Sequence, residues 1–375
     1  MFCTRALESV STPAVVMDLT VVCNNLAAAA RLACDGGVAL RPHVKTHKSL
    51  RLAAMQCELG AVGVTAAKPS EAAMFLRAGM PSVTVAYPVL RANLIQKLLD
   101  AAADGGGEVR FVVDNQIGLE TLANGARRPG RLLPAFMEID VGLQRCGVNP
   151  DTQAAAALAA ALDRAPGIHF LGLLSHAGQA YGAAGPVAVR AIAAQERALM
   201  ASLADRLRRS GIQVEECSVG STPTVFLNDG FDGLTEAPPG NYVFMDLIQV
   251  TPGVARPQDV ALQVLATVVS ANASFAILDA GSKVLSSDRA PHGSETLQGH
   301  GLALPQDGGA PRQIVRLSEE HGFVRQDGRP LRAGERVCVI PNHACPVANL
   351  ADRYLVADGA GVVEHWPVDA RGTVQ

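Results

Sequence analysis

Short apolar runs that favour β-strands alternate with helix-like segments up to about residue 245, and this alternation constrains the fold more than any other feature. Strand-like runs occur at 38–42, 61–65, 83–87, 109–113, 135–139, 169–174 and 212–217, with a weaker eighth run at 233–237. Helix-like segments separate them at 50–59, 70–78, 90–103, 116–126, 152–163 and 187–210. Strands that alternate with helices form parallel sheets. We therefore predict an α/β fold, a TIM-like (β/α)8 barrel preceded by a helix over 21–34.

The pattern changes after residue 246. Strand-like runs at 261–269, 275–278, 313–317, 336–340 and 354–356 are joined by glycine-rich connections with little helical periodicity. This texture indicates a second, mostly β domain. We predict a barrel over 12–245 and a C-terminal β domain over 246–375, with residues 1–11 packed on the β domain.

Bulk properties exclude several classes of partner. The net charge of −3 gives no electrostatic basis for binding nucleic acid. The eight cysteines are scattered without a CxxC pair, which is typical of reduced thiols. The N-terminal residues do not resemble a signal peptide, and the chain has no run of 18 apolar residues. These features predict a cytoplasmic protein without a membrane partner.

The segment Arg41-Pro42-His43-Val44-Lys45-Thr46-His47-Lys48 follows the first strand-like run of the barrel. Two of the chain's five lysines lie in it, although the chain has 27 arginines. An arginine stays protonated, whereas a partly buried lysine can lose its proton and form a Schiff base. The alternative is a solvated basic loop. The position at the end of an apolar strand favours a reactive amine at Lys45.

A loop of glycine and hydroxyl residues follows the seventh strand-like run, at Ser218-Val219-Gly220-Ser221-Thr222-Pro223-Thr224. Active sites of such barrels lie at the carboxyl ends of the strands, and a phosphate site often follows strand seven or eight. A helix-capping turn would have a similar sequence. An amine and a phosphate cradle at one barrel mouth together indicate pyridoxal phosphate.

The second domain contains the sequence Asn342-His343-Ala344-Cys345. On a strand, residues two apart face the same way, so His343 and Cys345 could bind one metal ion. An imidazole and a sulfur suit Zn²⁺. The alternative is a buried cysteine beside a hydrogen-bonded histidine.

Eight motifs carry a family resemblance, in chain order: RPHVKTHK (41–48), EIDVGLQRCGV (138–148), HAGQAY (176–181), SVGSTPT (218–224), PPGNYVFMD (238–246), LDAGSK (278–283), SEEHG (318–322) and PNHACPVANL (341–350). Together they resemble the D-serine dehydratase and D-threonine aldolase family, fold type III pyridoxal phosphate enzymes related to alanine racemase. The resemblance implies an N-terminal (β/α)8 barrel, a C-terminal β domain and a homodimer.

The resemblance also implies roles for particular residues. Lys45 corresponds to the Schiff-base lysine, Arg145 to the arginine near the cofactor ring, and Tyr181 to the active-site tyrosine. The phosphate site corresponds to Gly220, Ser221 and Thr222, together with Asn241 and Tyr242. His343 and Cys345 match the metal pair. Dehydratases of the family have His-x-Cys with zinc, whereas the aldolases typically have His-x-Asp with manganese or magnesium.

The activity implied is elimination of the β-hydroxyl from a D-3-hydroxy amino acid, which gives a 2-oxo acid and ammonia. D-Serine, D-threonine and D-3-hydroxyaspartate remain open as substrates, and His176 or Arg289 would favour the last. A metal-dependent aldolase, which gives glycine and an aldehyde, is the alternative activity. An amino-acid racemase and a non-catalytic pyridoxal phosphate carrier are further alternatives.

Overall fold

The structure is a computed structural model that describes residues 7–126, 132–289, 297–358 and 361–375. The chain divides into two compact units, each assembled from separate stretches of sequence. Of the described residues, those within 29–45, 52–240 and 373–375 form the barrel unit. Those within 7–28, 46–51 and 241–372 form the β unit. Neither unit is therefore a single continuous stretch of the sequence.

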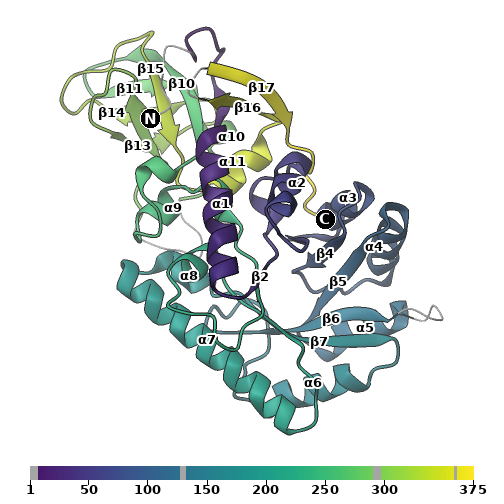
Figure 1. The fold of residues 1–375 in the computed structure, drawn as a ribbon. Coiled ribbons are helices and arrows are strands. Elements are labelled where there is room, and N and C mark those ends of the chain that lie inside the picture. Colours follow the sequence, from purple (N-terminus) through teal and green to yellow (C-terminus); the bar gives the residue numbers. More distant parts are fainter. Residues whose placement is uncertain (1–6, 127–131, 290–296, 359–360) are drawn as a thin grey trace. The chain divides into compact units, whose positions relative to one another are not determined.

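The barrel unit is built on eight parallel strands in consecutive order (Figure 1). They are β2 (Ala39–Leu40), β3 (Val64–Ala66), β4 (Ser82–Val85), β5 (Glu108–Val113), β6 (Leu133–Ile139), β7 (Ile168–Ser175), β8 (Glu216–Ser218) and β9 (Glu236–Ala237). The first and last strands pair with each other, because Ala39 and Leu40 of β2 lie opposite Glu236 and Ala237 of β9. A parallel bridge from His43 to Thr65 joins the end of β2 to β3. The predicted barrel is therefore confirmed.

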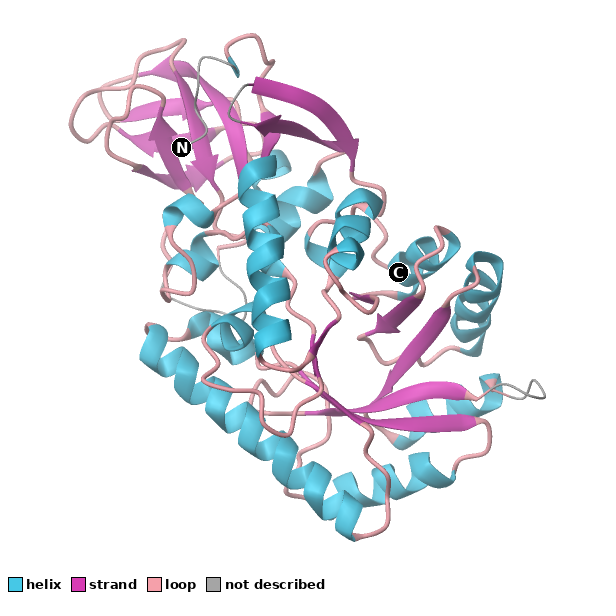
Figure 2. Ribbon diagram, in the orientation of Figure 1, coloured by secondary structure: helices cyan, strands magenta, loops and turns pink. Residues whose placement is uncertain are grey.

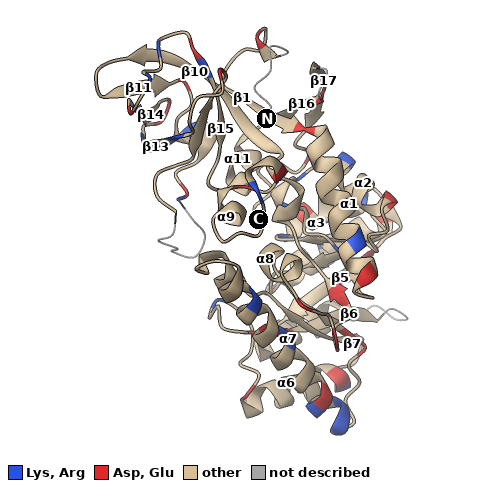
Figure 3. Ribbon diagram, turned by 60° about the vertical axis from the view of Figure 1, so that its left-hand side comes forward, with Lys and Arg blue, Asp and Glu red and all other residues tan. Residues whose placement is uncertain are grey.

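Helices surround these strands (Figure 2). They are α3 (Pro69–Arg77), α4 (Ala92–Gly105), α5 (Gln116–Gly125), α6 (Gln153–Arg164), η3 (Gly178–Gly182), α7 (Pro186–Arg209) and α8 (Thr222–Phe226). Every residue of β6 is buried, as expected of a parallel strand that is covered on both faces. Basic and acidic positions are mixed on helices such as α6 and α7 (Figure 3), which fits the net charge of −3.

Hydrogen bonds within single turns explain where some of these helices begin and end. The Asn115 side chain accepts a hydrogen bond from the Gly118 N–H at 2.9 Å and starts α5. Gly106, at φ +70°, ends α4 in a left-handed conformation that glycine adopts without strain.

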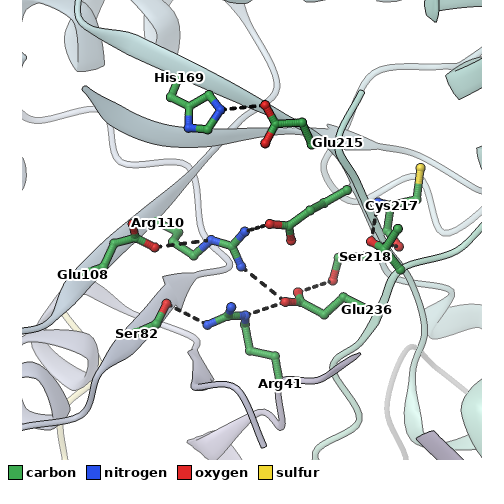
Figure 4. A network of polar contacts seen from close by, with 11 residues as sticks. Arg41, Ser82, Glu108, Arg110, His169, Glu215, Cys217, Ser218 and Glu236 are labelled. Atoms are coloured by element: carbon green, nitrogen blue, oxygen red, sulfur yellow. Dashed lines mark hydrogen bonds and ion pairs between the residues drawn. The ribbon is translucent and has the colours of Figure 1, made fainter. Parts of the chain in front are cut away.

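A buried ion-pair network joins strands β2, β5, β8 and β9 inside the barrel unit (Figure 4). Glu236 Oε2 accepts hydrogen bonds from Arg41 Nε at 2.6 Å and from Arg110 Nη1 at 3.2 Å. Its other oxygen accepts from Ser218 Oγ at 2.8 Å, and Arg110 also pairs with Glu216. Because the charges are paired, the burial of both guanidinium groups is tolerated.

The β unit contains a nine-stranded, mainly antiparallel sheet in the order β11-β14-β13-β12-β15-β10-β1-β16-β17. Its strands are β1 (Ala14–Asp18), β10 (Leu262–Ala271), β11 (Phe275–Leu278), β12 (Leu302–Pro305), β13 (Arg312–Leu317), β14 (Gly322–Arg325), β15 (Arg336–Ile340), β16 (Arg353–Asp358) and β17 (Gly361–Pro367). Its helices are η4 (Asn241–Val243), α9 (Leu247–Val250), η5 (Pro257–Asp259), α10 (Ser282–Leu285) and α11 (Ala344–Leu350). A further pairing of β10 with β11 closes six of these strands on themselves.

Three helical segments each contain a point at which the chain changes from one unit to the other: α1 (Leu19–Asp35), η2 (Val44–Thr46) and α2 (Leu50–Glu58). The helix expected over 21–34 corresponds to α1. The strand β1 before it was not predicted, and it pairs with β10 and β16. The described N-terminal residue Leu7 packs with Val16 and Leu265 in the β unit. Residues 12–28, 46–51 and 241–245, which the prediction places in the barrel, group with the β unit by their contacts. The predicted packing of residues 1–11 on the β domain lies outside the described residues for 1–6.

Two sequence expectations concern the chemistry of the chain as a whole. Six described cysteines are free thiols, but Cys338 is disulfide-bonded, so the expectation of reduced thiols was wrong for Cys338. In the described parts of the chain, no helix combines the length and the apolar character needed to cross a membrane.

Candidate active site

A cavity of about 280 Å³ lies at the carboxyl ends of the barrel strands. The described residues that line it lie within the last residues of β3, β6 and β7 or in the loops after β2, β3, β4, β6, β7, β8 and β9: His43, Lys45, Thr65, Ala67, Ala86, Tyr87, Pro88, Glu138, Arg145, Cys146, Leu174, Ser175, His176, Gly220 and Pro238. Three of the predicted cofactor residues, Lys45, Arg145 and Gly220, are therefore brought together. They come from positions up to 175 residues apart in the sequence.

Lys45 lies on η2, directly after β2, and its side chain is half-buried. The turn places two histidine nitrogens beside backbone N–H groups. The Lys45 N–H donates to His43 Nδ1 at 3.3 Å, and the Ser49 N–H donates to His47 Nδ1 at 3.1 Å. The alternating histidines of this motif therefore have a structural role in the turn that carries the amine.

The loop after β8 runs into the short helix α8. Gly220 has φ +121°, and a Cβ there would lie 2.4 Å from Val225 Cγ2, so the position requires glycine. Ser221 caps α8, and its backbone N–H donates to Thr224 Oγ1 at 2.9 Å. Ser221 and Thr222 are buried and are not among the described lining residues, whereas Gly220 is.

A buried carboxylate on α7 holds two of the loops at the cavity. Ser175 Oγ donates to Glu196 Oε1 at 2.7 Å, and Glu196 also bonds the Thr224 side chain and the backbone of Ala177 and Gly220. Burial raises the pKa of Glu196 to about 7, although these hydrogen bonds lower it. Sequence reasoning missed Glu196, although it interrupts the apolar face of a long helix.

Tyr181 lies on η3, one turn beyond the end of β7. Its ring centroid is 6.3 Å from that of His176, with an interplanar angle of 44°. His176 lines the cavity, so Tyr181 lies next to a lining residue and is not itself among the described ones.

Glu138 is a lining residue that sequence reasoning did not assign. It is 6 % exposed, and its Oε2 has no hydrogen-bond partner among the described residues. Burial raises its pKa to about 7; Arg145 lowers it, while Asp114 and Asp140 raise it. The signal in the sequence was a carboxylate inside the apolar run Ala135-Phe136-Met137-Glu138-Ile139.

Asp114, Glu138 and Cys146 offer ligand atoms that lie within 4.8 Å of one another. Arg145 acts electrostatically on Glu138 and is hydrogen-bonded to Cys146. A guanidinium group this close opposes the binding of a second cation. Glu138 and Cys146 line the cavity, whereas Asp114 is not among its described lining residues, and we assign no metal ion to this group.

The predicted metal pair lies in the β unit. His343 and Cys345 are hydrogen-bonded to each other through their side chains. The prediction that both lie on a strand was wrong, because β15 ends at Ile340 and α11 begins at Ala344. His343 is the extended N-cap residue of α11 and Cys345 lies in its first turn, and this geometry still brings the two side chains together.

The surroundings of the pair favour a thiolate beside an imidazolium group. Burial raises the pKa of Cys345, but His343 and Thr46 together lower it by more, so the pKa of the thiol is below its usual value. Burial lowers the pKa of His343, whereas Cys345, Asp288 and Asp246 raise it, and the net direction is up. A thiolate is the form of cysteine that binds metals.

Other side chains of the β unit contact this pair. Cys345 Sγ is hydrogen-bonded to Thr46 Oγ1 at 3.2 Å, and Thr46 follows Lys45 in the sequence. Asn241 Nδ2 lies 3.9 Å from the same sulfur and donates to Asp246 Oδ2 at 2.6 Å. The structure thus shows Asn241 beside the metal pair, while its predicted phosphate contact stays a prediction. Tyr242 is fully buried.

Comparison with known proteins identifies the family. The model of the alanine racemase N-terminal domain matches residues 17–247, and a serine dehydratase domain model matches residues 261–357. The D-threo-3-hydroxyaspartate dehydratase of Delftia sp. is 35 % identical, with 96 % of this chain and 97 % of that protein covered. A D-threonine aldolase of Arthrobacter sp. is 31 % identical, with 98 % and 94 % covered.

Solved structures agree with these matches. The structure of the Delftia dehydratase superposes with a TM-score of 0.89 at 33 % identity, covering 97 % of this chain and 99 % of that one. The D-threonine aldolase of Filomicrobium marinum gives a TM-score of 0.86 at 32 % identity, with 98 % of each chain covered. The chain therefore belongs to the D-serine dehydratase and D-threonine aldolase family of pyridoxal phosphate-dependent lyases, which have an alanine racemase-like fold.

Proposed function

We propose that this protein is a lyase that removes the β-hydroxyl group of a D-3-hydroxy amino acid and releases a 2-oxo acid and ammonia. The observation that carries the proposal is the cavity in which Lys45, Arg145 and Gly220 meet. The family membership supports an enzyme of this class, since its members include dehydratases and aldolases of D-hydroxy amino acids.

The cavity fits pyridoxal phosphate. Its volume of about 280 Å³ approaches that of typical ligand pockets, which begin near about 300 Å³. Lys45 would hold the cofactor covalently, and Gly220, at the start of α8, would lie at its phosphate with Ser221 and Thr222. Asn241 and Tyr242 belong to the same predicted phosphate set. When bound, the cofactor supplies an electron sink at Cα and a zinc ion supplies a Lewis acid at the β-hydroxyl.

The chain's own residues have separate tasks in this proposal. Lys45 Nζ takes the proton from Cα, which requires its neutral form. Arg145 lines the same cavity and would bind an anionic group of the cofactor or substrate. Tyr181, beside His176, is proposed as a further proton-carrying group near the substrate. His43, His176 and the buried Glu138 are further polar residues of the lining.

His343 and Cys345 would hold the metal ion, for which an imidazole and a thiolate favour zinc over manganese or magnesium. Solved forms of a D-threo-3-hydroxyaspartate dehydratase carry alanine in place of a histidine or of a cysteine, and the cysteine variant was solved metal-free. Those two residues are separated by one residue, as His343 and Cys345 are. This correspondence supports a dehydratase with a metal-dependent step.

The aldolase reaction is the second candidate, because aldolase relatives match nearly the whole chain. D-Threonine distinguishes the two reactions: dehydration gives 2-oxobutyrate and ammonia, whereas cleavage gives glycine and acetaldehyde. The protein would be loaded with pyridoxal phosphate and zinc, and D-serine and D-3-hydroxyaspartate would be tested in parallel. We expect 2-oxo acid and ammonia from at least one of them. Glycine as the main product would overturn the dehydratase assignment, and an L-amino acid product would indicate a racemase.

Lys45→Arg is the matched variant for this assay. Arginine keeps the positive charge but cannot lose its proton, so it can neither form the Schiff base nor act as the base. We therefore expect a loss of turnover on the order of 10³-fold or more. Lys97, exposed on α4, gives the control variant Lys97→Arg, which is expected to keep full activity. Equal activity of Lys45→Arg and the control would contradict the assigned role.

The homodimer implied by the resemblance and the cytoplasmic location predicted from the bulk properties of the sequence are part of this proposal. Light scattering coupled to size-exclusion chromatography would test the first, with a mass near twice 39.0 kDa expected.

A further inference from the structure

The Asp288 carboxylate contacts one residue of the predicted metal pair, His343, in the β unit. His343 Nδ1 and Asp288 Oδ2 lie 2.7 Å apart. Because an ionised carboxylate only accepts hydrogen bonds, the imidazole proton lies on Nδ1 in this contact. Nε2 is then the ring nitrogen left for a metal ion, which would displace the proton that the imidazolium form carries there.

The segment that carries Asp288 is anchored next to His343. Asn342, the residue before His343, donates through Nδ2 to the backbone oxygens of Arg289 at 2.7 Å and Gly299 at 3.0 Å. Ser286 adopts φ +63°, which is unfavourable for a residue with a side chain, and its Oγ accepts from the Asp288 N–H at 3.1 Å. These contacts hold the Asp288 backbone in a defined position relative to the imidazole.

The position of Cys345 depends on a different carboxylate. Asp246, fully buried, accepts a hydrogen bond from the backbone N–H of Ala344 at 2.8 Å and one from Asn241 Nδ2 at 2.6 Å. Asp246 therefore fixes the backbone between the two ligands. Asp288 contacts the His343 ring itself, so its removal changes the ring more directly than the backbone.

We propose that Asp288 is a positioning residue for the metal ion, which fixes the tautomer and the orientation of the His343 imidazole so that Nε2 and Cys345 Sγ can bind one ion. This inference rests on the proposed function, in which these two residues hold the metal. Metal-bound histidines usually donate their other N–H to such a carboxylate, and loss of that partner typically lowers metal affinity by about 10- to 100-fold.

Titration of the full-length, metal-free protein with Co²⁺ tests this role without a turnover assay. Cobalt reports its ligands through ligand-field and thiolate charge-transfer absorption bands. We expect wild type to develop both bands, and Asp288→Asn to require about 10- to 100-fold more free Co²⁺. Asp352→Asn is the control, since Asp352 pairs with Arg371 on the surface of the same unit, and it is expected to behave as wild type.

Each outcome of the titration supports or overturns the inference. Wild-type affinity in Asp288→Asn, with weak binding in His343→Ala, would overturn the role of Asp288 while the metal pair stands. Absence of cobalt binding by wild type would overturn the metal part of the proposed function and this inference together. If Asp288→Asn loses the native circular dichroism spectrum, Asp288→Ser replaces it, with the same loss of affinity expected.

Discussion

At the scale of single residues, the buried Glu138 carboxylate makes the stability of the folded protein depend on pH. Its carboxylate is 6 % exposed and Oε2 has no partner among the described residues, so ionisation inside the folded protein is unfavourable. The pKa is raised from 4.5 to about 7, mainly by burial. The folded state therefore holds this proton more tightly than the unfolded state.

The consequence is a loss of stability as the pH rises from 4.5 to about 7. Below this range Glu138 is protonated in both states, and above it the folded state contains a buried charge. In cofactor-free protein, Glu138→Gln should therefore gain stability relative to wild type between pH 5 and pH 8, by up to about 3 kcal/mol. Urea unfolding at both pH values measures this difference.

Glu120→Gln is the control for that comparison, because the Glu120 side chain is exposed on α5. It should leave the pH dependence of the free energy of unfolding close to that of wild type. A Glu138→Gln variant whose stability runs parallel to wild type from pH 5 to pH 8 would show that the raised pKa is wrong.

Three of the residues that sequence reasoning identified share one property: each lies within six residues after the end of a recognisable apolar strand. Lys45, Arg145 and Gly220 follow β2, β6 and β8, and all three line the cavity. Glu138 lies inside a strand and Glu196 inside a helix, where a charged residue is most simply expected to face solvent. Which of these charges is buried depends on the packing of distant elements, and the local pattern does not contain that information.

At the scale of elements, the network around Glu236 joins strands from opposite ends of the barrel sequence. The Arg41, Arg110 and Glu236 side chains are 7 %, 4 % and 3 % exposed. Removal of the carboxylate charge would leave Arg41 without this ion pair and would weaken the pairing of Arg110. An uncompensated buried charge is among the most destabilising changes in a protein interior.

We therefore expect Glu236→Gln to lower the free energy of unfolding by about 3–5 kcal/mol. Urea unfolding followed by far-ultraviolet circular dichroism would measure it. Glu215→Gln is the control, because Glu215 forms an exposed pair with His169 (Figure 4) and should cost less than about 1 kcal/mol. A similar small cost for both variants would contradict the structural importance of the network.

For the metal pair, the predicted secondary structure was wrong, although the prediction that the two side chains lie close together was confirmed. His343 and Cys345 were expected to share a strand face, but they belong to the start of α11. The run Ala344-Cys345-Pro346-Val347-Ala348-Asn349-Leu350 has a proline at the third helical position, which a helix tolerates in its first turn. That signal, together with His343 in an extended N-cap conformation, distinguishes a helix start from a strand.

At the scale of the whole molecule, the regular alternation of strands and helices was enough to predict the barrel, since each βα repeat forms locally and neighbours pair in sequence order. Which strands form the sheet of the β unit was harder to predict. Its strand β1 comes from the N-terminus and pairs with β10 and β16, some 250 and 340 residues later. Such pairings depend on long-range contacts that leave no periodic signal in the sequence.

The central claim is that Lys45 is the amine that holds the cofactor. The most direct measurement is borohydride reduction of the pyridoxal phosphate-loaded protein, followed by mass spectrometric mapping of the modified peptide. The chain has five lysines, and fragmentation distinguishes Lys45 from its neighbour Lys48. We predict a single stoichiometric phosphopyridoxyl group on Lys45 in wild type, and none in Lys45→Arg. Modification centred on Lys48, Lys68, Lys97 or Lys283, or no incorporation, would contradict the account.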